Sequence, residues 1–242
     1  MIRDEFIPLM AKMTQKFRIS KPARLCRLMV AAAAFAVVIP CAGGAVDFSS
    51  NLLAYVNTRF GRDAPPRLLI WQKLVRDMKR ADEGVKPGSE SQTLKKVNDF
   101  FNQVPYGSDL QLWGVEDYWA TPVEMLGIFG GDCEDYVIAK YLSLKELGIP
   151  IERMRLTYVK ALKLGEAHMV LAYYAKPDSE PLILDNLIGE VRPASMRTDL
   201  EPVYSFNDDD LWLPSGAARK GGASQVRLWR DLREKLDKEQ RM

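Results

Sequence analysis

The chain has 242 residues, of which 47% are hydrophobic and 27% are charged, values that are ordinary for a globular protein. Its formal net charge is +2, but residues 1–45 alone hold seven Lys and Arg against two Asp and Glu, which leaves the rest of the chain at −3. A basic surface of the kind that binds nucleic acid is therefore not expected, and we predict no nucleic-acid partner.

The first 45 residues have the three-part pattern of an export signal. Basic residues precede an apolar run over 28–39, and small residues follow it. A run of 12 apolar residues is too short to cross a membrane. We therefore expect residues 1–45 to be a secretory signal, cleaved after Ala42 or Ala45, and the mature chain not to span the membrane. An uncleaved anchor is the alternative.

Helical spacing of apolar residues predicts two helices before residue 105, whereas residues 51–56 show no firm period. The first helix begins at Pro65-Pro66, because proline is favoured in a first helical turn, and the second ends before Pro105. The Gly- and Pro-containing segment 82–91 between them predicts a loop. The expected core-facing residues are Leu68, Trp71, Leu74, Val75 and Met78 in the first helix and Leu94, Val97, Phe100, Phe101 and Val104 in the second.

Residues 106–122 form an aromatic segment without regular spacing, in which Asp109, Glu116 and Asp117 are interleaved with tyrosines and tryptophans. Aromatic residues at such spacing indicate core or rim packing more than a binding platform, and the carboxylates are candidate ligands. Thr121-Pro122 then predicts the start of a short helix over 123–129.

The sequence GGDC at 130–133 predicts the start of a longer helix. Asp132 is a favourable N-cap, and Gly148 provides the stop. The apolar positions that follow share one helical face: Cys133, Val137, Tyr141, Leu144 and Leu147. Cys133 is thus placed at a helix N-terminus, where unpaired backbone N–H groups and the helix dipole favour the thiolate.

The number of cysteines narrows the role of this thiol. Cys26 and Cys41 lie in the export signal, so Cys133 is the only cysteine of the mature chain and can form no internal disulfide. A lone exported thiol is either a buried hydrophobic group or a reactive one. Because glycines and charged residues flank Cys133, we predict a reactive cysteine that acts as a nucleophile.

After Gly148 the pattern changes to alternation, which predicts strands over 154–158, 167–175 and 181–187 and shorter strands near 203–206 and 211–213. Helices followed by antiparallel strands indicate the α+β class, with the N-terminal helices and the nucleophile helix packed on an antiparallel sheet. The tail from Arg219 to Met242 has eight basic and four acidic residues and a narrow helical stripe. It is expected to dock on the body, fray or bind a partner.

His168 is the only histidine of the chain. An isolated histidine in a strand is usually structural, but here Cys133 precedes it and Asp185 follows it, the order of Cys-His-Asp hydrolases of papain-like and transglutaminase-like fold. In that arrangement the thiolate attacks a carbonyl carbon, the histidine exchanges the proton and the aspartate fixes the tautomer. The backbone N–H of Cys133 is a candidate oxyanion donor.

Two carboxylates beside the thiol, Asp132 and Glu134, oppose its ionisation. One interpretation is that they only cap the helix and complement its dipole. The other is that Asp132, Glu134 and Asp135, with Asp117 or another acid of the aromatic segment, bind Ca²⁺, which prefers oxygen ligands and would cancel the local negative charge.

Four blocks of sequence resemble the bacterial transglutaminase-like cysteine proteinases: DYWATP at 117–122, GGDCEDYVIAKY at 130–141, AHMVLAYY at 167–174 and LDNL at 184–187. The resemblance covers roughly Pro65 to Pro214 and implies a papain-like or transglutaminase-like core. We expect this domain over 46–216, followed by a basic helical tail over 217–242. The resemblance implies Cys133, His168 and Asp185 as the triad. It also implies calcium dependence through Asp132 and Glu134, with Asp117 and Asp135 as further ligands.

The resemblance also implies a cellular role. Members of the family cleave the N-terminal region of a large surface adhesin in the periplasm at a pair of alanines, which disperses biofilm, and an inner-membrane cyclic-di-GMP receptor sequesters the protease. Two alternatives remain open. The same triad could transfer the acyl group to an amine, as in a transglutaminase, or the chain could be an inactive binding module.

Overall fold

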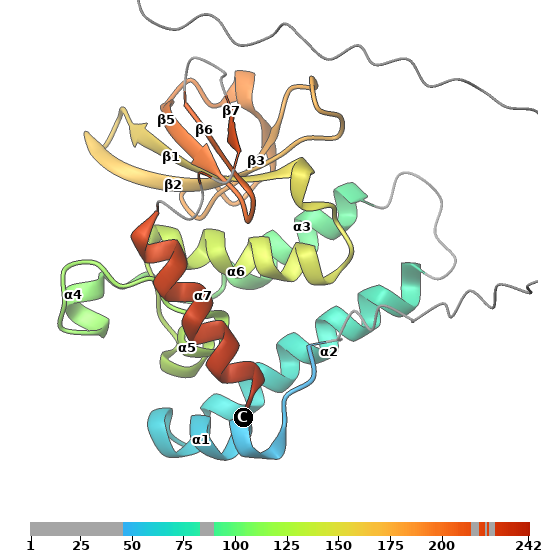
Figure 1. Ribbon diagram of the computed structural model, residues 1–242, viewed down its shortest axis with the longest axis vertical. Helices are drawn as coiled ribbons and strands as arrows, with labels where there is room; N and C mark the ends of the chain where they lie inside the picture. Colours follow the sequence, from blue (N-terminus) through green and yellow to red (C-terminus); the bar gives the residue numbers. More distant parts are fainter. Residues whose placement is uncertain (1–45, 83–89, 214–217, 221, 223–225) are drawn as a thin grey trace, which may run out of the picture. The chain divides into compact units, whose positions relative to one another are not determined.

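The computed structural model describes residues 46–82, 90–213, 218–220, 222 and 226–242 (Figure 1). The predicted export signal, most of the predicted loop at 82–91 and the expected boundary at 216–217 lie outside these residues. Within the described ranges, no helix combines the length and the hydrophobicity that a membrane crossing requires.

Three helices form the N-terminal part: α1 (Ser50–Phe60), α2 (Ala64–Asp82) and α3 (Glu90–Phe101). The last two are the predicted pair. The sequence pattern missed α1, which begins where the Ser49 side chain accepts a hydrogen bond from the Leu52 N–H at 3.0 Å and so caps the helix.

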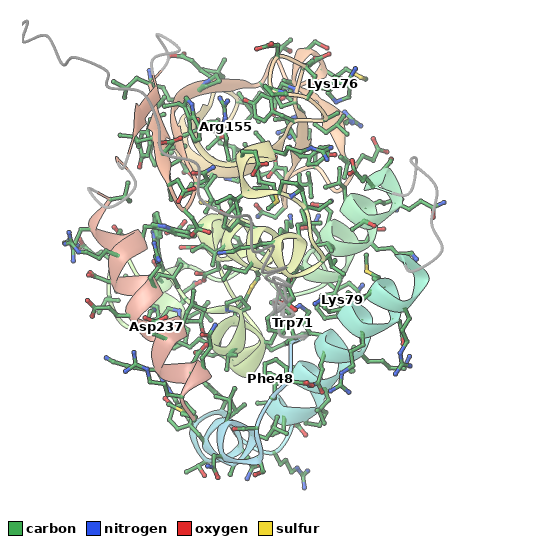
Figure 2. All side chains as sticks on the ribbon, turned by 45° about the vertical axis from the view of Figure 1, so that its right-hand side comes forward. Phe48, Trp71, Lys79, Arg155, Lys176 and Asp237 are labelled. Carbon is green, nitrogen blue, oxygen red and sulfur yellow. The ribbon has the colours of Figure 1, made fainter. Side chains whose placement is uncertain are left out.

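The side chain of Trp71 ties α2 to the rest of the helical layer. Its indole N–H donates to the Ser143 hydroxyl at 3.0 Å, and its ring lies 5.6 Å from that of Phe48 (Figure 2). A cavity of about 570 Å³ opens beside Trp71, but Cys133 and His168 are not among the residues that line it. This cavity is therefore separate from the residues of the predicted catalytic site.

The segment before the nucleophile helix contains a single helical turn, α4 (Asp109–Leu112), and a short helix, α5 (Pro122–Ile128). Thr121 caps α5 as predicted, because its hydroxyl accepts from the Glu124 N–H while the Glu124 carboxylate accepts from the Thr121 N–H, both at 3.1 Å. The nucleophile helix, α6 (Cys133–Glu146), begins at the predicted residue.

The strands form one antiparallel sheet in the order β4-β3-β2-β1-β5-β6-β7. The strands are β1 (Met154–Ala161), β2 (Glu166–Tyr173), β3 (Leu182–Leu184), β4 (Arg192–Pro193), β5 (Leu200–Phe206), β6 (Asp210–Trp212) and β7 (Ala218–Lys220), with 3₁₀ turns at Ile151–Arg153 and Ala194–Met196. The predicted α+β class is confirmed. Strands β4 and β7 were not expected from the sequence.

Helices α3 and α6 lie beneath the sheet, and α6 packs directly on β1 and β2 (Figure 1). Met169, Leu171 and Tyr173 of β2 belong to the main core shared with the helices, whereas Val170 and Ala172 belong to a second cluster with Val159 and Ile183. The central strands are therefore buried on both faces, which fixes their register.

The C-terminal tail docks on the body as helix α7 (Arg227–Gln240), which crosses one end of α6 and passes α5 in Figure 1. Trp229 is buried with its ring 5.8 Å from that of Tyr141 and 5.5 Å from that of Phe206. Lys235 forms an ion pair of 3.1 Å with Glu124. Docking buries the narrow apolar stripe that the sequence shows.

We predict that Trp229→Ala lowers the free energy of unfolding by about 3–5 kcal/mol, because it removes a buried indole and leaves a cavity between α6 and the sheet. Arg233→Ala, at an exposed position of the same helix, should change it by less than about 0.5 kcal/mol. Urea denaturation measures both, and equal midpoints for the two variants would contradict the docked position of α7.

Candidate active site

Cys133 is the first residue of α6, and its thiol is partly buried. The sulfur donates a hydrogen bond to the Glu134 carboxylate at 3.0 Å. Burial raises the pKa of this thiol, the charge of Glu134 and then of Asp132 raise it further, and the backbone N–H of Met169 acts in the opposite direction. Without a compensating positive charge, this environment favours the neutral thiol over the thiolate.

Gly131, two residues before α6, must be a glycine for steric reasons. A Cβ on Gly131 would lie 2.9 Å from the Asp135 Cβ, closer than such atoms approach. Gly131 also forms an isolated β-bridge with Tyr106, and its carbonyl accepts from the Gly107 N–H at 3.1 Å. Tyr106 is 66% exposed and therefore lies at the surface beside the start of the nucleophile helix.

His168 and Asp185 form a buried pair. The pairing of β2 with β3, in which Leu171 lies opposite Leu184, brings the two residues together. The His168 Nε2 lies 2.8 Å from the Asp185 Oδ1, which also accepts from the Leu187 N–H at 3.1 Å. Water is excluded from the pair, since His168 is 5% exposed and Asp185 is fully buried.

The Asp185 carboxyl has a pKa below its usual range. Burial acts to raise the pKa, but the hydrogen bond and charge of His168, the Leu187 N–H and Arg197 together outweigh it. Asp185 is therefore a carboxylate at neutral pH, and its Oδ1 can accept a hydrogen bond from the Nε2–H of the imidazole.

Of the three predicted triad residues, His168 and Asp185 are in direct contact. Their side chains are hydrogen-bonded, and Cys133 begins the helix that packs on β2, the strand of His168. Because α6 packs on β2, the thiol and the imidazole belong to one region of the structure.

Three carboxylates gather beside the thiol. Asp109, Asp132 and Glu134 each place one oxygen within 4.8 Å of the others. Asp109 is buried, and its Oδ2 accepts from the Tyr118 N–H at 2.6 Å. The buried Oδ1 atoms of Asp109 and Asp132 have no hydrogen-bond partner among the described residues.

Burial raises the pKa of Asp109 to about 6 and the pKa of Asp132 to about 10, with the charge of Glu134 adding to both. Close carboxylates with unsatisfied oxygens are costly without a cation. Their oxygen donors suit a hard divalent ion such as Ca²⁺, so these residues fit that ion.

Two other residues predicted as metal ligands lie outside this cluster. Asp135 is 1% exposed, and its oxygens accept from the Ala120 N–H at 2.7 Å and from the Asp132 N–H at 3.4 Å, which caps α6 and holds the preceding segment. Asp117 is exposed overall. Partial desolvation of its carboxyl, and then the charge of Glu134, raise its pKa.

The sequence indicated Asp109 only as one acid of the aromatic segment. It did not indicate that Arg197 and Lys140 are buried in the core. Arg197 is 3% exposed beside Asp185. Lys140 of α6 is fully buried, and burial lowers its pKa to about 7 while Asp185 and Asp99 act against that shift. Nothing in the local sequence indicates these contacts, because they join distant segments.

Residues 76–207 match the family model of the bacterial transglutaminase-like cysteine proteinases. The match covers more than half of the chain, so the chain belongs to this family of cysteine proteases. No curated protein gives a significant match.

Among solved structures, the chain is similar to LapG of Legionella pneumophila, with 37% identity over 80% of this chain and 99% of that chain and a TM-score of 0.64. An EGTA-treated form of LapG gives 37% identity over 80% and 100% of the two chains, with a TM-score of 0.65. A calcium-bound form gives 39% over 78% and 99%, with a TM-score of 0.62.

Proposed function

We propose that this chain is an exported, calcium-dependent cysteine endopeptidase whose triad is Cys133, His168 and Asp185. The observation that carries the proposal is the buried 2.8 Å contact between the only histidine and Asp185, on the strand that packs against the nucleophile helix. A histidine oriented by a carboxylate next to a helix-terminal cysteine is the arrangement that acyl-transfer chemistry requires.

In the proposed reaction, the Cys133 thiolate attacks the carbonyl carbon of a peptide bond. Asp185 holds the Nε2–H of His168, which leaves Nδ1 to take the thiol proton and then to give it to the departing amine. Water hydrolyses the resulting thioester. The backbone N–H of Cys133, at the start of α6, stabilises the oxyanion.

Asp109, Asp132 and Glu134 would hold the calcium ion, with Asp117 and Asp135 as the other acids expected from the sequence. We favour Asp109 over Asp135 because both oxygens of Asp135 already accept backbone N–H groups. The ion supplies positive charge that offsets the carboxylates beside the thiol. The calcium-bound form of Legionella LapG, at 39% identity, supports calcium as the ion.

The proposed substrate is the N-terminal region of a large surface adhesin, cleaved in the periplasm to disperse biofilm. The proposed regulator is an inner-membrane cyclic-di-GMP receptor that sequesters the protease. Both rest on the sequence resemblance to the family and on the export signal predicted for residues 1–45.

We predict that Cys133→Ala and His168→Ala each abolish cleavage of the N-terminal fragment of an adhesin from the same genome, read by product mass. Asp185→Asn should reduce the rate strongly, whereas Asp178→Asn, at an exposed position on the loop before β3, should not. Wild-type cleavage that survives in either alanine variant would refute the triad. Products heavier than the fragment would indicate transfer to an amine instead of hydrolysis.

We predict that calcium binding, measured by calorimetry, weakens at least about tenfold in Asp109→Asn and Asp132→Asn, because each variant loses a charged ligand. Asp178→Asn, at an exposed position on the loop before β3, serves as the matched control and should bind nearly as the wild type does. Chelation of calcium should also stop cleavage. Wild-type affinity in the first two variants would exclude the cluster as the calcium site.

A further inference from the structure

Arg197 contacts the side of Asp185 that His168 leaves open. Its Nη2 lies 2.7 Å from the Asp185 Oδ2, in an ion pair between two fully buried side chains. The Nε and Nη2 groups donate to the two carboxylate oxygens of Asp199 at 3.0 and 2.9 Å. Because these N–H groups point mainly at Asp199, the contact with Asp185 is a close charge pair more than an aligned hydrogen bond.

The backbone holds Arg197 in place on both sides. Its N–H donates to the Ala194 carbonyl at 2.9 Å, and its carbonyl accepts from the Leu200 N–H at 3.1 Å. The carbonyl of Asp199 accepts from the Leu162 N–H at 2.8 Å, just beyond the end of β1. The guanidinium is therefore presented to Asp185 from a segment anchored to the central strand.

Two charged or titratable side chains contact Asp185: His168 from β2 and Arg197 from the turn after Ala194–Met196. The charges of Asp185 and Asp99 also act on the buried Lys140 of α6. Lys140 is fully buried with a pKa of about 7, so it is charged only in part at neutral pH. The pKa of Arg197 is raised: burial acts against its charge, and Asp199 and Asp185 outweigh burial. Arg197 is the permanent positive charge of the group.

We propose that Arg197 is a positioning residue of the active site, which holds the Asp185 carboxylate so that its Oδ1 accepts from the His168 Nε2–H and Nδ1 stays available to the thiol. The proposal rests on the proposed triad and adds a fourth member to it. Outer contacts that orient the ligands of a metal site are typically worth about 10–100-fold in activity, and we expect a loss of the same order for a contact that orients a triad carboxylate.

The kinetic test compares Arg197→Met and Arg197→Lys in the full chain with calcium present. Arg197→Met should lower kcat about 10–100-fold with little change in KM, because it disorders the proton-transfer pair and leaves substrate contacts intact. Arg197→Lys should have a kcat between those of the wild type and Arg197→Met, since it keeps the positive charge but lacks the planar guanidinium. Wild-type kcat in Arg197→Met would overturn the proposal.

Arg153 offers a matched control for the loss of an arginine. It forms a bidentate pair with Glu90 at 2.9 and 2.7 Å, next to the same sheet but without contact to Asp185. Arg153→Met should leave kcat near the wild-type value. An equal loss in Arg153→Met and Arg197→Met would assign both to general destabilisation and overturn the specific role.

A second readout needs no activity. His168 is the only histidine, so its ring nitrogens give a single pair of ¹⁵N signals. In a Cys133→Ala background with neutral imidazole, we expect one tautomer with the proton on Nε2, and a mixture of tautomers once Arg197→Met is added. A single Nε2–H tautomer in both would refute the role of Arg197. The proposed function fails separately, if Cys133→Ala or His168→Ala still cleaves the fragment.

Discussion

The buried contact between His168 and Asp185 determines how the rest of the site is arranged. It exists because β2 and β3 pair in one register, and because both faces of these strands are packed that register cannot slip. Burial strengthens the contact by removing water, but it also makes an uncompensated carboxylate costly. Arg197, the Leu187 N–H and the imidazole together supply that compensation.

The N-terminus of α6 brings two opposing electrostatic effects together. The helix terminus favours a thiolate at Cys133, whereas Asp109, Asp132 and Glu134 place negative charge within reach of it. Burial and the charge of Glu134 raise the pKa of Asp132, so keeping all three acids ionised is costly without a cation. A bound dication would reverse the balance, so the same cluster couples the proposed metal to the nucleophile.

Much of this arrangement could be predicted from the sequence, because it follows from local patterns. The start of α6 and the alternation in β2 depend on neighbouring residues, and so does the Thr121 cap of α5. The approach of Asp109 to Asp132 and Glu134, and of Arg197 to Asp185, could not be predicted, because each joins different segments of the chain. Their side chains acquire a role only when the chain folds.

The rate of alkylation of Cys133 by iodoacetamide, followed by the mass of the peptide that contains it, tests the central claim most directly, because the reagent reacts with the thiolate. If Cys133 and His168 act as a pair and calcium offsets the acids, alkylation near neutral pH should be fast with calcium and slow with a chelator. It should also be slow in His168→Ala even when calcium is present. If wild type and His168→Ala were alkylated at equal rates, both with calcium and with the chelator, Cys133 and His168 would not act as a pair.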